Sequence, residues 1–265
     1  MTTTHITGKG TAMTDVLTLP APRTDVRVRR TAPSLTSLIG LEVRKSLSTR
    51  SGKSLAAVAV LIGPAGMALL GLTGDQFPDV LGPLAVVGVM TGLLLLALGV
   101  LSTGGEWTHR TVQTTFLLVP RRGRVLAAKE IAVALLGVVL AAVSAGLSLL
   151  VLSGVAPAEA SWDGLGAAVP AVLGAGAAFA MAGAGVGAAT GNTAAALTGL
   201  YLLILGAMQI LRVWNAELVG WIDPVDATLM LVQGMQRTQA AVVLAGWMVV
   251  SAVAGWLVTR RRQVG

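Results

Sequence analysis

The chain has 265 residues, of which 54% are hydrophobic and only 12% charged, and its mean hydropathy is +0.79. Soluble domains carry about 25% charged residues, so the composition excludes an ordinary soluble protein and predicts an all-α integral membrane protein. The net charge is +7, but base-stacking aromatic residues make up only 4% of the chain, so we expect membrane lipid and no nucleic acid as the electrostatic partner.

Cysteine is absent from the sequence, which excludes disulfides, thiolate chemistry and sulfur-ligated metals. The two histidines, His5 and His109, stand alone outside the apolar runs. We therefore expect no metal site.

Residues 1–33 are polar and basic without helical periodicity, which predicts a disordered cytoplasmic tail ahead of one membrane domain over 34–265. No secretory cleavage pattern follows, so the first span is expected to act as an uncleaved anchor. Translation could start at Met1 or at Met13.

Gly52-Lys53-Ser54 matches the end of a phosphate-binding P-loop, whose glycines let backbone N–H groups wrap the phosphates. Leu47 stands where the first glycine of that motif belongs, and a long apolar run follows Ser54. The sequence therefore predicts that Lys53 is a basic flank of a membrane helix and that this chain does not itself bind ATP.

Six apolar runs are each close to the length needed to cross about 30 Å of hydrocarbon. They cover about 54–73, 81–102, 131–153, 167–189, 195–211 and 239–258. The fourth and fifth are divided only by the turn-forming stretch 190–195. In the fourth run, Gly183 and Gly187 have the spacing of close helix packing, either within the chain or at a dimer face.

Basic residues fix the expected orientation. Nine lie before the first span, five between spans two and three and three after span six, which places 17 of 19 on one side and leaves Arg212 and Arg237 on the other. Both termini are therefore expected in the cytoplasm of a multi-pass plasma-membrane protein. None of the six predicted runs contains Asp, Glu, Lys, Arg or His, which disfavours ion-coupled transport and intramembrane proteolysis.

Three segments outside the spans also look folded. The stretch 33–49 places Leu35, Leu38, Ile39 and Val43 on one stripe of an interfacial helix. Glu42 lies near this stripe, so either the helix is only moderately amphipathic or Glu42 meets a protein partner. On the opposite side of the membrane, 212–236 predicts paired short helices with a break at Asp223-Pro224, the alternative being a plain interfacial loop.

The segment 104–130 predicts a helix after span two, with Glu106 four residues before Arg110 in a favourable pairing. Pro120 ends this helix, and Arg121, Arg122 and Arg124 form a basic corner. A docking element is favoured over a solvated surface helix, because a structured insertion is more than a connection between spans needs.

The segments Leu41–Gly52, "LEVRKSLSTRSG", and Gly105–Lys129, "GEWTHRTVQTTFLLVPRRGRVLAAK", resemble those of permease subunits of type-2 ATP-binding-cassette (ABC) transporters. The resemblance implies a six-span permease that pairs with a second copy or a paralogue. It also implies a separate ATP-binding subunit, which would bind the ATP and Mg²⁺ while this chain binds no cofactor and has no catalytic residue.

The resemblance also assigns roles to particular residues. A coupling contact to the ATP-binding subunit would comprise Glu106, Trp107, Arg110, Thr111 and Gln113, with a smaller contact at Asn192 and Thr193. A connector helix would include Leu38, Glu42 and Lys45. Spans two and five would line the pathway through Met90, Thr91, Tyr201, Met208 and Gln209.

An apolar lining would suit export of a hydrophobic or amphipathic cargo such as a drug, lipid or peptide. Two other classes stay open on the sequence: a non-transporting membrane protein that binds a partner, such as an immunity or assembly factor, and a membrane enzyme. The scarcity of convergent polar residues within the spans weighs against the enzyme.

Overall fold

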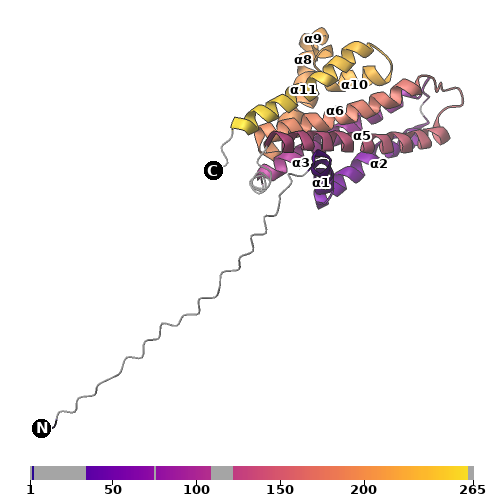
Figure 1. Ribbon diagram of the computed structural model, residues 1–265. Helices are drawn as coiled ribbons and strands as arrows, with labels where there is room; N and C mark the ends of the chain where they lie inside the picture. The colour runs from indigo at the N-terminus through magenta and orange to yellow at the C-terminus, as the bar shows by residue number, and fades with distance from the viewer. Residues whose placement is uncertain (1, 3–33, 75, 109–121, 262–265) are drawn as a thin grey trace. The chain divides into compact units, whose positions relative to one another are not determined.

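The computed structural model describes residues 2, 34–74, 76–108 and 122–261 (Figure 1). Apart from Thr2, the tail predicted over 1–33 lies outside the described residues. The described part of the chain is helical, and its only bridge between extended segments joins Asp79 to Ser161.

Six helices are long and apolar enough to cross a membrane, which confirms the predicted number of spans. Four of them are α2 (Arg50–Thr73), α3 (Leu81–Thr108), α6 (Leu165–Thr190) and α11 (Arg237–Arg261). The third span lies in α5 (Arg122–Val155). The fifth is built from α7 (Thr193–Tyr201), the π-helical turn η1 (Leu202–Ala207) and α8 (Met208–Trp214).

Several helices extend beyond their predicted apolar runs. Glu106 lies in the last turn of α3, and Lys129 lies about two turns inside α5. Because the helices continue past the apolar run, they carry ionisable groups into the ends of the bundle, where these groups find partners.

The centre of the bundle is the packing of α3 against α6, through glycines that let the two backbones approach closely. A Cβ added at Gly183 would overlap the carbonyl oxygen of Leu96, and one at Gly187 would lie 2.5 Å from Thr103 Oγ1. Both glycines of the spaced pair therefore face α3, which confirms packing within the chain as the use of this motif.

Buried hydroxyl groups form hydrogen bonds between the helices. Apolar packing alone does not determine which faces of two helices meet. Thr91 of α3 lies 3.0 Å from Ser144 of α5, hydroxyl to hydroxyl. Thr103 of α3 donates to the Ala184 carbonyl of α6 at 2.8 Å. These bonds fix the rotation of α3 relative to its two neighbours.

Two short helices follow the fifth span: α9 (Ala216–Gly220) and α10 (Pro224–Val232). The chain breaks between them at Asp223-Pro224, as the sequence predicted, and Asp223 caps α10 by accepting from Val225 N at 2.8 Å. Ala227, Thr228 and Val232 of α10 are buried, because this helix packs against α3, α6 and α11. It is thus part of the bundle and not a surface loop.

Candidate functional site

The candidate site begins with α1 (Leu35–Ser46), which packs against α5 ahead of the first span (Figure 1). Ser34 caps this helix by accepting from Ser37 N at 3.1 Å. Leu38 and Glu42, one turn apart, are the buried residues of α1. The inward face of α1 is therefore mixed, with an acidic group one turn after an apolar one.

Glu42 pairs with Lys129 of α5, so the acid that interrupts the apolar stripe meets a partner inside the same chain. Neither alternative offered by the sequence described this arrangement. Sequence spacing could not reveal the pair, because the two residues are 87 positions apart.

The pair belongs to a cluster of four charged side chains, the α1–α3–α5 charge cluster: Glu42, Lys45, Glu106 and Lys129. Lys129 Nζ lies 3.0 Å from Glu106 Oε1 and donates to the Ser102 carbonyl at 3.2 Å. Lys45 pairs with Glu106 and lies 3.8 Å from Glu42 Oε1. Two carboxylates and two ammonium groups make the cluster neutral.

Burial makes this neutrality necessary. The side chain of Lys129 is 5% exposed, and those of Glu42 and Glu106 are 10% and 9% exposed. Charges withdrawn from water are costly unless each is paired and hydrogen-bonded. Lys129 has bonds for all three of its ammonium protons, to Glu42, Glu106 and Ser102. It is the residue that holds the three helices together at this end.

A cavity of about 510 Å³ adjoins the cluster. Lys45 and Glu106 line it together with Ser46 and Thr49 near the α1–α2 turn and Thr193 at the start of α7. Lys45, whose side chain is 42% exposed, is therefore the member of the cluster that solvent reaches most easily.

The segment of the predicted coupling contact and the turn of the predicted smaller contact meet at this end of the bundle. Thr108, two residues after Glu106, lies 3.2 Å from Thr193, hydroxyl to hydroxyl. Thr193 N also donates to Thr108 Oγ1, at 3.4 Å. Asn192 is exposed and caps α7 by accepting from Ala195 N at 3.0 Å. The end of α3 and the turn between α6 and α7 therefore form one continuous surface.

The other predicted docking residues have different positions. Glu106 points into the charge cluster and is 8% exposed. Trp107 is half-buried and lines a small cavity with Val125 and Thr259. Arg110, Thr111 and Gln113 lie outside the described residues, so their part of the docking prediction remains a prediction.

The predicted pathway residues do not share one surface. Met90 and Gln209 are exposed, whereas Met208 is buried. Thr91 is fully buried and bonded to Ser144. Tyr201 is half-buried and donates to the Leu93 carbonyl at 2.8 Å, which ties the fifth span to α3. The lining role of this set remains a prediction.

A second ionic cluster lies beside α10 and was missed by the sequence analysis. Arg212 of α8 donates to Asp223 at 2.8 Å and forms an ion pair with Asp226 at 2.7 Å. Burial, followed by the charge of Asp226, raises the pKa of the fully buried Asp223 carboxyl, although the hydrogen bonds from Val225 N and Asp226 N and the charge of Arg212 act in the opposite direction. The cluster fixes the corner between the fifth span and α10.

Metal ligands do not gather in the described ranges, where no group of three or more His, Asp or Glu side chains is placed to hold an ion. No protein-family model matches the sequence, and no curated protein matches it. Functional inference therefore rests on the arrangement of the chain's own residues.

Proposed function

We propose that this protein is the membrane-spanning permease subunit of an ATP-driven exporter of the type-2 ABC class. It would act with a separate ATP-binding subunit and a second permease, either a copy of itself or a paralogue. The observation that carries the proposal is the contact between Thr108 and Thr193, because it joins both predicted docking segments at the end of the bundle where α1 lies.

The charge cluster supports the proposal by offering a mechanical connection. A force applied to the segment after α3 would reach Glu106 within one turn of helix. Glu106 is bonded to Lys129 of α5 and Lys45 of α1, so three helices would respond together. ATP hydrolysis in the partner subunit could thus move spans two and three and the connector as a unit, giving alternating access.

The six spans support a hydrophobic or amphipathic cargo. Their acidic and basic side chains lie near the helix ends, and the middle of the described bundle is apolar or carries hydrogen-bonded hydroxyl groups. Such spans offer no fixed charge to hold a hydrophilic ion at mid-membrane. A drug, lipid or amphipathic peptide is the cargo class that we propose.

The test is co-purification of the chain, tagged at its C-terminus, from its native membranes in mild detergents. We expect a stoichiometric ATP-binding subunit with the wild type. Charge reversal by Arg110→Glu in the predicted docking segment should remove it, because a charged contact is worth about 1.5–3 kcal/mol. Arg237→Glu is the matched control, since Arg237 is exposed at the start of α11, on the other side of the membrane.

Coupling is tested separately by Glu106→Gln, which keeps the size of the side chain and removes its charge. We expect the partner to remain bound while substrate-stimulated ATP hydrolysis and export fall. Recovery of no ATP-binding subunit in any detergent would contradict the proposal. Equal recovery with Arg110→Glu and Arg237→Glu would contradict the docking site.

A further inference from the structure

A long apolar groove lies between the fifth and sixth spans, apart from the charge cluster. It has a volume of about 560 Å³, within the range of about 300–1,000 Å³ that is typical of ligand sites. Its walls are Leu203 of η1, Met208 of α8, Val186 of α6 and a row of residues along α11, with Trp221 and Ile222 at one end. No residue of this lining is ionisable.

The groove follows the axis of α11. Its lining on this helix runs from Val242 to Ala254, which at 1.5 Å per residue is about 18 Å. Half of the hydrocarbon core of a bilayer is about 15 Å thick. Because α11 crosses the membrane, the groove has the direction and the length of one acyl chain in one leaflet.

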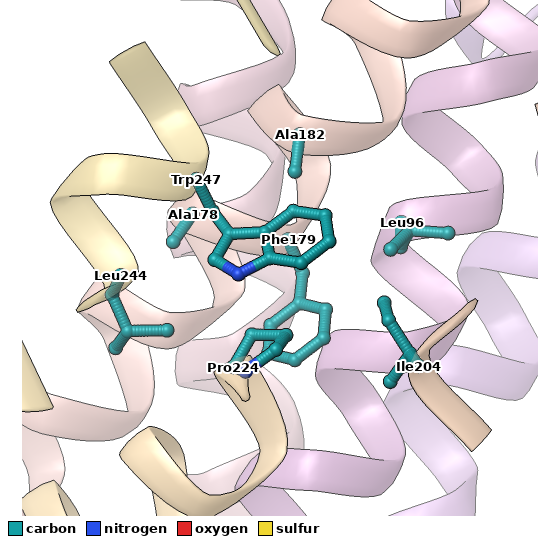
Figure 2. A pocket seen from close by; sticks show the side chains of 8 residues that line it. All are labelled: Leu96, Ala178, Phe179, Ala182, Ile204, Pro224, Leu244 and Trp247. Carbon is teal, nitrogen blue, oxygen red and sulfur yellow. The ribbon is translucent and has the colours of Figure 1, made fainter. Parts of the chain in front are cut away.

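The polar groups in the lining are already satisfied within the chain. Trp247 Nε1 donates to the Ile222 carbonyl at 2.8 Å, and Ser251 Oγ donates to the Trp247 carbonyl. Trp247 also lines a second, small cavity with Leu244, Phe179 and Ile204 (Figure 2). The indole is thus a fixed wall that offers the groove only apolar surface.

Charged residues lie at one end of the groove. Ile222 is followed directly by Asp223, and Met208 lies one helical turn before Arg212, so the Arg212 cluster adjoins this end. Trp214 and Trp221, both exposed, lie in the same region, as tryptophans do at headgroup level. An uncharged groove that ends beside charged groups complements a molecule with an apolar tail and a polar head.

We propose that the groove binds one acyl chain of a membrane phospholipid, with the headgroup beside the Arg212 cluster. The surrounding surface supports lipid as the occupant, because Leu205, Val249 and Val250 are each at least half exposed and apolar. The lipid site is independent of the proposed docking of an ATP-binding subunit.

Gly246 allows a direct test. It lines the groove, and a Cβ added to it meets no atom within 4 Å, so Gly246→Leu adds a side chain at the groove whose first atom has open space around it. Gly146→Leu is the matched control: Gly146 is an exposed glycine inside α5 that also has open space around it and does not line the groove.

The full chain is reconstituted in phosphatidylcholine vesicles whose acyl chains are brominated, and quenching of Trp247 is measured. The Trp247 emission is the difference between each protein and the same protein carrying Trp247→Phe. We expect strong quenching in the wild type and in Gly146→Leu, and loss of most of it in Gly246→Leu. Equal quenching in all three proteins would overturn the proposal.

A second copy of the chain is the competing occupant, and the oligomeric state of the same proteins distinguishes it. The lipid assignment predicts that Gly246→Leu leaves the oligomeric state unchanged. Dissociation of an oligomer by Gly246→Leu, with Trp247 still quenched by brominated lipid, would identify the groove as an interface between copies and would also overturn the proposal.

Discussion

Replacement of Lys129 by methionine is the sharpest test of the charge cluster. Methionine keeps much of the apolar stem of lysine but removes the ammonium group that bonds Glu42, Glu106 and the Ser102 carbonyl. Glu106 would keep Lys45 as its partner, whereas Glu42, within the described part of the chain, would have only Lys45 Nζ nearby, at 3.8 Å. The variant therefore strands one carboxylate whose side chain is 10% exposed.

The size of the effect follows from the burial of the pair. Breaking a buried ion pair by removing one partner costs about 3–5 kcal/mol, because it leaves an uncompensated buried charge. We expect Lys129→Met to lower the free energy of unfolding by about 3–5 kcal/mol.

The assay is reversible unfolding in mixed detergent micelles, followed by helical circular dichroism. Lys53→Met is the matched control, because Lys53 is an exposed lysine in the first turn of α2. The double variant Glu42→Gln, Lys129→Met restores neutrality and should recover about 1–3 kcal/mol of the loss. A double variant less stable than Lys129→Met alone would refute the reasoning, as would a single variant as stable as Lys53→Met.

Two further predictions concern the packing of α6 and the Arg212 cluster. Gly183→Ala should destabilise the bundle by about 1–3 kcal/mol, because the new Cβ would overlap the Leu96 carbonyl. Gly174→Ala on the same helix, where a Cβ meets open space, should be neutral or slightly stabilising, and equal unfolding curves for the two would contradict the packing argument. Burial raises the pKa of Asp223 above its ordinary value of 3.8, so the folded state holds this proton more tightly than the unfolded state does. The free energy of unfolding should therefore fall as the pH rises through the interval above 3.8. Asp223→Asn keeps an oxygen to cap α10, and it should reduce the dependence of the free energy of unfolding on pH between about pH 4 and pH 7. An unchanged dependence in the unfolding curves would show that Asp223 does not cause it.

The number of spans could be predicted from the sequence because long apolar runs respond to one dominant constraint, the thickness of the bilayer. The break at Asp223-Pro224 and the close packing of Gly183 were also readable, since proline and spaced glycines act locally. The ends of the helices could not be predicted from the sequence, because α3 and α5 continue into polar sequence that gives no apolar signal.

The candidate site was only partly predictable for a related reason. Glu42, Lys45 and Glu106 were each singled out, but their mutual contacts depend on how α1 packs against α5, which no local pattern encodes. Lys129 was counted only as a cytoplasmic basic residue. Equal numbers of acidic and basic residues near the ends of several helices are the signal that could have suggested the cluster.

The proposed ATP-binding subunit would dock where the turn between α6 and α7 meets the end of α3. Because the chain has no cysteine, one cysteine at a time can be introduced and cross-linked in native membranes. Ala194→Cys probes the proposed site without removing the Asn192 cap, and Glu159→Cys probes an exposed position in the connection between α5 and α6. We expect a covalent adduct with an ATP-binding subunit from Ala194→Cys and none from Glu159→Cys. No such adduct from Ala194→Cys, or equal adducts from both positions, would rule out docking at this surface.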